Sequence, residues 1–525
     1  MIHSIGRLSL RRRTTGTLRA SLLFAPLFLT WPALALAQTT PQSTAQPTAM
    51  DRGAIERQLE EIRAMRAQMS AQMGALDAKV ETLQAELERT VPGIDIPPDP
   101  PAPQGATNAS IVTLPAREGQ PDIAHDAVEE VYEPGRGIVL ASGNWGEMSA
   151  TLISYARYLN QQALNESYTD SFGRTFPIDR RQDLQFNKVN LTFKGWMIDP
   201  RFRYLIFLWT QNTAQGQGAQ VVIGGYLSYK FNKAFSVQAG VGALPTTRTT
   251  MYTFPNWLRV DNRTITDDYM RGSYTTGIWA DGEIATNLHY RVMLGNNLSQ
   301  LGIDAGQLDD GLNTVAAALW WFPTTGEFGT AAGFGDYDWH EKVATMFGVN
   351  FTRSREDAQS QPDSNAIENS QIRLSDGTRL FQPDALGNGE QITAATYRML
   401  AMNAGVKYHG MALEGEYYFR WLDDFDSTGP TPFNDTFDHG FQLQASMVPI
   451  KDRLQAYISA SKTWGEFGDP SDVALGVNYY PFGARQIRFN AQALLLNQSP
   501  VGYASVPYVV GGDGWAFTAD AMLTF

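Results

Sequence analysis

Apolar and polar residues alternate along most of the chain from about residue 145 to its end. The segment Val189–Phe193 has this pattern, and so do Phe235–Val241 and Trp515–Phe525. A period of two is typical of a β-strand whose two faces meet different surroundings. Counting such segments predicts about 16 strands, most of them long enough to cross a bilayer at the usual tilt. The predicted strands lie near 147–159, 186–196, 203–213, 222–232, 235–245, 274–285, 286–298, 312–322, 341–352, 396–408, 409–422, 437–449, 452–463, 471–482, 484–498 and 513–525.

The connections between these strands alternate in length. Short turns such as 449–452 and 482–484 alternate with long loops such as 246–273 and 353–395, as in outer-membrane barrels. An even number of strands places both ends of the sheet on the same side. The sequence therefore predicts an all-β fold, a transmembrane antiparallel β-barrel over residues 137–525.

Two alternatives remain open for this region. Fourteen or eighteen strands are the alternatives to the predicted count, because the first strand and the region 312–340 have the weakest pattern. A soluble β-sandwich would need apolar positions that face a shared core, and single domains of that kind rarely approach about 380 residues. The barrel is therefore the favoured interpretation.

The region before the barrel has two further patterns. In residues 51–91, apolar residues recur in steps of three and four, as in Leu59–Ile62 and Leu76–Val80, which predicts a coiled-coil helix. The alternative is an antiparallel partner helix elsewhere in the chain, although no second heptad run exists. Residues 92–136 are rich in proline and then in acidic residues, so we expect an extended linker without a core.

The N-terminal residues 1–37 match a secretory signal peptide. Five arginines precede a short apolar core at 22–29, and Ala35–Ala37 is a small-x-small cleavage site. The core is too short to cross a membrane, and a retained anchor is the alternative. We expect a mature chain that lies outside the cytoplasm and begins with a polar segment, 38–50.

Composition and charge restrict the function further. The chain has no cysteine, and a closed sheet would supply stability instead, because it leaves no strand edge unpaired. Removing five of the 41 basic residues with the signal peptide leaves 36 against 54 acidic residues, a net charge of −18. Such an acidic chain is a poor binder of nucleic acid.

Strand periodicity nominates charged residues for the inner face of the barrel. A charge on the lipid face at mid-depth costs about 2–4 kcal/mol, so these side chains are expected to point inward or to lie at an interface. The basic candidates outnumber the acidic ones, which predicts a slightly cationic lumen that favours anions. The basic candidates are Lys188, Lys194, Lys230, Arg291, Lys342, Lys407, Arg420 and Arg488, and the acidic candidates are Asp281, Glu283, Glu414, Glu416 and Asp520.

The mature sequence contains no recognisable catalytic constellation. Its histidines lie outside Gly-x-Ser-x-Gly and His-Glu-x-x-His contexts, and it has no P-loop and no dinucleotide-binding fingerprint. The segment 336–341 is the richest in metal-ligand side chains, and we expect it to be an ordinary loop. The sequence therefore predicts neither an enzyme nor a cofactor or metal site.

Three regions carry a resemblance to a known family. The segment Phe235–Arg248, a strand that ends in a proline-containing turn, resembles a landmark of the phosphate-selective porin O and P family. The segments Gly277–Glu283 and Leu288–Asn297 are similar to the next hairpin of that family. The plan of coiled coil and barrel is similar to the related DcaP-like trimeric porins, and Phe525 resembles the terminal assembly signal of outer-membrane barrels. The resemblance implies a sixteen-stranded barrel, a homotrimer and a three-stranded stalk in the periplasm.

A barrel of this size leaves an aqueous channel, so its selectivity must come from an inward-folded loop and from lumen charges. The candidate loop is 246–273, in which opposed arginines and carboxylates would form a charge filter. An ordinary solvated surface loop is the alternative. The charged residues of this loop are Arg248, Arg259, Arg263, Arg271, Asp261, Asp267 and Asp268.

These patterns predict a channel in the outer membrane of a Gram-negative bacterium, for passive uptake of small hydrophilic, anionic solutes. Its expected partners are membrane lipid, further copies of the chain and the solutes. No run matches the arginine ladder of phosphate-specific family members, so small anions or dicarboxylate-like solutes are expected. The alternative is a structural tether or receptor whose coiled coil contacts peptidoglycan or another periplasmic partner.

Overall fold

The computed structural model describes residues 137–211, 220–251, 253–301, 303, 305–309, 311–362 and 371–524. The predicted signal peptide (1–37), polar segment (38–50), coiled coil (51–91) and linker (92–136) lie outside these residues, as does Phe525. Those features stay predictions.

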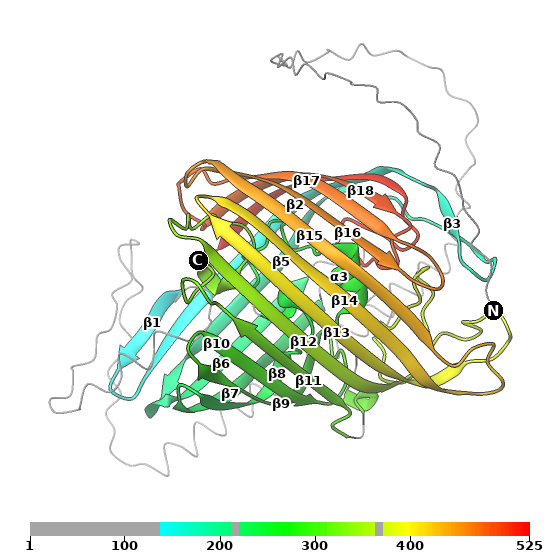
Figure 1. Ribbon diagram of the computed structural model, residues 1–525, viewed down its shortest axis with the longest axis horizontal. Helices are drawn as coiled ribbons and strands as arrows, with labels where there is room; N and C mark the ends of the chain where they lie inside the picture. Colours follow the sequence, from blue (N-terminus) through cyan, green and yellow to red (C-terminus); the bar gives the residue numbers. More distant parts are fainter. Residues whose placement is uncertain are drawn as a thin grey trace, which may run out of the picture. The chain divides into compact units, whose positions relative to one another are not determined.

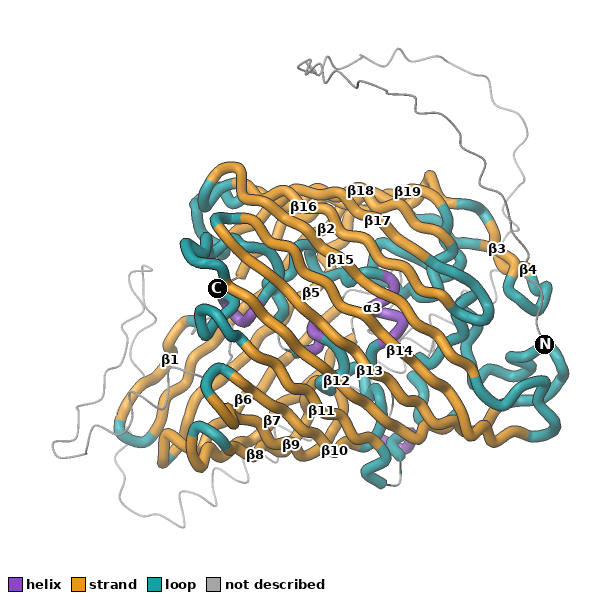
Figure 2. The backbone as a smooth tube through the Cα atoms, viewed as in Figure 1, coloured by secondary structure: helices purple, strands orange, loops and turns teal. Residues whose placement is uncertain are grey.

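Sixteen strands close into an antiparallel barrel (Figures 1 and 2). Each strand is hydrogen-bonded to the next one along the chain, and the last, β19, pairs with the first, β2. The strands of the barrel are β2 (Gly146–Leu164), β5 (Gln182–Met197), β6 (Asp199–Gln211), β7 (Gln220–Asn232), β8 (Phe235–Ala243), β9 (Tyr274–Ala285), β10 (Leu288–Gly295), β11 (Thr314–Trp321), β12 (Ala344–Asp357), β13 (Ile392–Tyr408), β14 (Met411–Ser427), β15 (Thr436–Ile450), β16 (Leu454–Trp464), β17 (Ser471–Tyr479), β18 (Ile487–Asn497) and β19 (Gly514–Thr524). Each predicted strand overlaps one of these, so the predicted fold class and strand number are confirmed.

Several smaller elements were not predicted. The short strand β1 forms a hairpin with the start of β2, and β3 pairs with β4 in the connection between β2 and β5. These elements are β1 (Ile138–Gly143), β3 (Ser167–Thr169), β4 (Thr175–Pro177), η1 (Arg248–Thr250), α3 (Ile265–Met270), η2 (Ala305–Gln307) and η3 (Thr330–Ala332). Within the described part of the chain, no helix is long and apolar enough to span a membrane.

The two faces of the barrel wall differ in polarity. On β17 and β18, Leu475 and Phe489 are exposed on the outside (53% and 46%), whereas Asp472 and Asn490 are buried on the inside. Exposing apolar surface to water costs about 25 cal/mol per Å², and large apolar side chains recur on the outer face of most strands. An apolar exterior around a polar interior is the pattern of a barrel in lipid.

The connections divide the barrel into a short-turn end and a long-loop end. At the short-turn end, the turn residues His409 and Gly410 both have positive φ (48° and 78°), as a two-residue type I′ hairpin requires. The segment 322–343 between β11 and β12 is the long exception at this end. At the long-loop end lie the connections 165–181, 244–273, 296–313, 358–391, 428–435, 465–470 and 498–513, as far as the structure describes them.

Candidate functional site

The connection 244–273 between β8 and β9, the inward loop, folds into the barrel. It contains η1 and α3, and most of its described residues are buried. The α3 helix begins after Thr264, whose side chain accepts a hydrogen bond from the backbone N–H of Asp267 (3.4 Å). The helix packs against β15, β16 and β17, which lie across the ring from β8 and β9, and Figure 1 shows it within the barrel. The candidate loop of the sequence therefore occupies the lumen.

Buried ion pairs hold the inward loop to the far wall. Arg259 contacts Asp472 of β17 at 2.7 Å. Arg248 pairs with Glu414 of β14, and its backbone N–H donates to Glu416 (3.0 Å). The side chains of both pairs are at most 2% exposed. Removing one partner of such a pair would leave the other charge buried without compensation.

These contacts correct one expectation. Sequence patterning suggested that all the loop arginines oppose carboxylates across an open pore, but Arg248 and Arg259 are buried against the wall. The reason is that the inner face of β14–β17 supplies carboxylates within reach of the loop. The two arginines position the inward loop and do not line an open channel.

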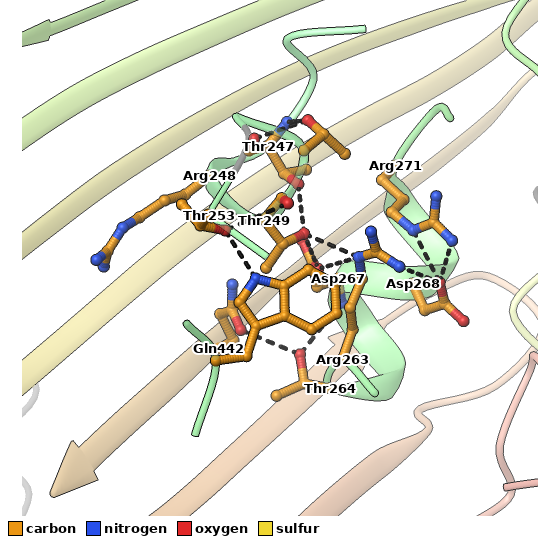
Figure 3. Close-up of polar contacts among 12 residues, drawn as sticks. Thr247, Arg248, Thr249, Thr253, Arg263, Thr264, Asp267, Asp268, Arg271 and Gln442 are labelled. Atoms are coloured by element: carbon orange, nitrogen blue, oxygen red, sulfur yellow. Dashed lines mark hydrogen bonds and ion pairs between the residues drawn. The ribbon is translucent and has the colours of Figure 1, made fainter. Parts of the chain in front are cut away.

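The remaining charges of the inward loop largely pair with one another (Figure 3). Arg271 contacts Asp268 at 2.6 Å, and Arg263 lies 3.6 Å from Asp267. The Thr249 hydroxyl donates to Asp267 at 2.5 Å. Burial raises the pKa of Asp267, and the neighbouring Arg263 opposes this shift. This network keeps η1 and α3 together as one folded unit inside the lumen.

A cavity of about 160 Å³ remains between the inward loop and the wall formed by β2 and β5–β9. Its charged lining consists of Lys188, Lys194, Arg263, Arg271 and Asp261. The Lys188 ammonium lies 2.7 Å from the Asp261 carboxylate and 4.0 Å from the centre of the Trp209 ring. Asp261, Asp267 and Asp268 pair with three of these four cations, which leaves a net charge of one positive unit around the cavity. Narrow charged channels concentrate ions of the opposite sign.

Strand β6 gives the cavity an apolar side that the sequence pattern did not predict. Leu205, Phe207 and Trp209 line the cavity, although β6 also has apolar residues on its outer face. With both faces apolar, alternation alone could not orient this strand. Arg203 lies on the same face of β6 as Phe207. Because a charged side chain is unfavourable in lipid, Arg203 is the residue that could have identified this face as the inner one.

Most of the predicted lumen charges lie on the inner face. One is placed differently: Lys342 is exposed in the connection before β12, because that strand begins at Ala344 and not at the predicted position 341. Lys230, Asp281 and Glu283 lie on the inner face and are less deeply buried. The buried members of the predicted set are Lys188, Lys194, Arg291, Lys407, Arg420, Arg488, Glu414, Glu416 and Asp520.

Four further buried charges of the inner face lie at positions that the strand pattern did not nominate. Arg157 of β2 pairs with Asp520 at 2.6 Å, and Asp438 pairs with Arg420 at 2.6 Å. Asp472 pairs with Arg259, and Glu356 is buried on β12. These contacts divide the lumen into a side filled by paired charges, along β12–β19, and an open side along β5–β9.

Comparisons with known proteins give distant similarities. No protein-family model matches the chain, and no curated protein matches it. The solved anion-selective porin from Comamonas acidovorans is similar over 72% of this chain and 100% of its own, with 11% identity and a TM-score of 0.47. OmpT of Vibrio cholerae is similar over 74% of this chain and 100% of its own, with 12% identity and a TM-score of 0.45. The outer membrane channel DcaP of Acinetobacter baumannii covers 73% of this chain and 98% of its own, with 8% identity and a TM-score of 0.45.

The described residues contain no group of three or more His, Cys, Asp or Glu side chains arranged to hold a metal ion. The segment 336–341, which is rich in such side chains, instead forms part of the connection between β11 and β12.

Proposed function

We propose that this chain is a porin of a Gram-negative outer membrane, which forms a water-filled channel for passive passage of small hydrophilic anions. The observation that carries this proposal is the cavity between the inward loop and β5–β9, whose charged lining is four cations and one carboxylate. The apolar outer face of the closed barrel supports a place in lipid.

Electrostatics favours anions over cations in this cavity. The four lining cations and the three carboxylates that pair with them, Asp261, Asp267 and Asp268, leave one excess positive charge. Two unit charges 4 Å apart interact by about 4 kcal/mol at an effective dielectric constant of 20, so this excess charge favours an anion that passes within contact distance. On the filled side, Arg157, Arg248, Arg259 and Arg420 each contact a carboxylate, so these paired charges largely cancel. Arg488 instead donates to the carbonyl of Trp257 (2.7 Å). The solute class we propose is small anions, including dicarboxylate-like ones.

The same proposal includes the assembly. The barrel domain would occupy residues 137–525 and associate as a homotrimer, with the coiled coil at 51–91 as a periplasmic stalk and the linker at 92–136 between them. Its support is the heptad pattern and the family resemblance of the sequence. Peptidoglycan is a candidate contact of the stalk.

Planar lipid bilayers test the proposal directly. The purified mature protein should produce discrete conductance steps, and the reversal potential in a KCl gradient should show a preference for chloride. Lys194→Gln should reduce that preference, because it removes one of the four cations of the cavity. Protein that inserts without conducting would overturn the channel and favour the structural tether, whereas a preference for potassium would overturn the anion assignment alone.

A further inference from the structure

The segment 322–343, here called the plug, is unlike the other connections at the short-turn end. Its neighbours there are brief, such as 286–287 and 409–410, whereas the plug is long and contains η3. Long loops usually run over the surface, but Phe328 and Phe334 of the plug are 1% and 5% exposed. The plug therefore folds back into the barrel from the short-turn end.

The plug meets the inward loop backbone to backbone. The backbone N–H of Phe334 donates to the carbonyl of Asn256 (2.7 Å), and the Arg248 guanidinium donates to the carbonyls of Ala332 (2.9 Å) and Gly333 (3.1 Å). A Cβ atom on Gly333 would lie 2.3 Å from the Cβ of Asn256, so the contact leaves no room for a side chain. The two segments enter the lumen from opposite ends and join inside it.

Two aromatic rings of the plug enclose the same arginine. The Arg248 guanidinium lies 4.0 Å from the centre of the Phe334 ring and 5.3 Å from that of Phe328. Cation–π contacts of this kind contribute most when they are shielded from water, and Arg248 is 2% exposed. Arg248 is therefore a positioning residue that holds the plug to the inward loop and, through Glu414, to β14.

The barrel wall holds the plug from the other side. Lys407 of β13 donates to the carbonyls of Phe328 (2.8 Å) and Gly333 (2.6 Å), and the backbone N–H of Gly335 donates to Glu414 (2.7 Å). At the barrel end, Asp338 contacts Arg485 at 3.0 Å. All these wall residues belong to the filled side, and none of the residues that line the cavity belongs to the plug.

We propose that the plug is a second constriction, which closes the filled side of the lumen from the short-turn end and thereby sets the size limit of the channel. This inference rests on the proposed channel function. With the plug and the inward loop joined, solutes have a path only along β5–β9. Without the plug, a second path opens beside β13–β16. The charged side chains exposed along this path are three cations, Lys407, Arg248 and Arg485, and one carboxylate, Glu414. The wider channel should therefore keep its preference for anions.

The test replaces residues 324–341 by a two-residue Asn-Gly turn in the full-length chain. Single-channel conductance should rise at least twofold, and liposome-swelling assays should show entry of a trisaccharide that the unmodified channel excludes. The chloride-to-potassium permeability ratio should stay above one. If the conductance and the size limit are both unchanged, the plug is not a constriction, even if the unmodified protein conducts anions.

A point variant covers the case in which the deletion prevents folding. Gly333→Val should separate the plug from Asn256 and raise conductance and the size limit in the same direction, by a smaller factor. Gly306→Val is the matched control, because Gly306 is exposed and a Cβ atom there would have no neighbour within 4 Å. Equal size limits for the two variants would contradict the proposal. Absence of any conductance in the unmodified protein would instead overturn the proposed function.

Discussion

The Lys188 ammonium of β5 lies 2.7 Å from the Asp261 carboxylate of the inward loop, at the surface of the cavity. The Tyr155 hydroxyl donates a second hydrogen bond to the same carboxylate (2.6 Å). Asp261 is the one carboxylate among the described residues that line this cavity. It ties the inward loop to the open wall and cancels part of the positive charge there.

Removing this negative charge should strengthen the preference for anions. Asp261→Asn keeps the shape of the side chain, and asparagine tolerates the positive φ of this position (44°). We expect the chloride-to-potassium permeability ratio to rise about two- to fivefold. This corresponds to roughly 0.4–1 kcal/mol, the part of the interaction between the Asp261 charge and a passing ion that remains after screening by salt. Reversal potentials in a salt gradient measure the ratio. The control Asp199→Asn neutralises an exposed carboxylate at the short-turn end and should leave the ratio unchanged; a lower ratio for Asp261→Asn would contradict the prediction.

The attachment of the inward loop should depend on the pair Arg259–Asp472. Arg259→Met removes the cation but keeps an apolar side chain of similar length, and it leaves Asp472 buried without its partner. Breaking a buried pair in this way costs about 3–5 kcal/mol. Urea unfolding in lipid vesicles should show this loss, and open-channel current noise should increase as the loop loosens.

The companion change separates the ion pair from general damage. Asp472→Asn in the Arg259→Met background removes the uncompensated charge, so part of the lost stability should return. Arg201→Met, which breaks an exposed pair with Asp199, should have little effect on unfolding, since solvated pairs contribute little. Equal losses for Arg259→Met and Arg201→Met would refute a structural role for the buried pair.

Strand alternation was sufficient to predict the barrel but not the contents of its lumen. Alternating segments such as 437–449 and 471–482 are local signals. The two ends of each of these predicted strands lie within three residues of the ends of the observed strands β15 and β17. The partners of Arg248 and Arg259 are more than a hundred residues away in the sequence, so no local pattern could show that these arginines are paired. The sequence of the plug has no apolar periodicity, so no local pattern indicates that it is buried. Contacts with Lys407 and Arg248, which belong to other elements, hold it inside the barrel.

The plug should loosen at alkaline pH because of His340. Hydrogen bonds with Asp336 and with Glu327 (3.1 Å) raise the pKa of His340 to about 9. Since this is above the ordinary value near 6.5, the stabilisation is complete below about pH 6.5 and is lost as the pH rises through about 9. The free energy of unfolding in vesicles should fall over this range in the unmodified protein and less steeply in His340→Gln. Identical pH profiles for His340→Gln and the unmodified protein would refute His340 as the origin of this pH dependence.

The closure of the ring should depend on Arg157 of the first barrel strand. Its guanidinium contacts Asp520 of the last strand at 2.6 Å and also donates to the carbonyls of Ser505 (2.8 Å) and Val260. One fully buried side chain thus joins β2, β19, the connection 498–513 and the inward loop.

Arg157→Met should therefore lower the free energy of unfolding in vesicles by about 3–5 kcal/mol, because it leaves a buried carboxylate and two carbonyls without their donor. Adding Asp520→Leu removes that carboxylate, so the double variant should recover part of the loss, while the carbonyls of Ser505 and Val260 stay unpaired. If the losses of unfolding free energy in the two single variants simply add in the double variant, the two side chains act independently. That result would contradict a stabilising ion pair between Arg157 and Asp520 across the closing strands. Recovery should be visible in the unfolding transition more than in conductance, since neither side chain lines the cavity through which the solutes would pass.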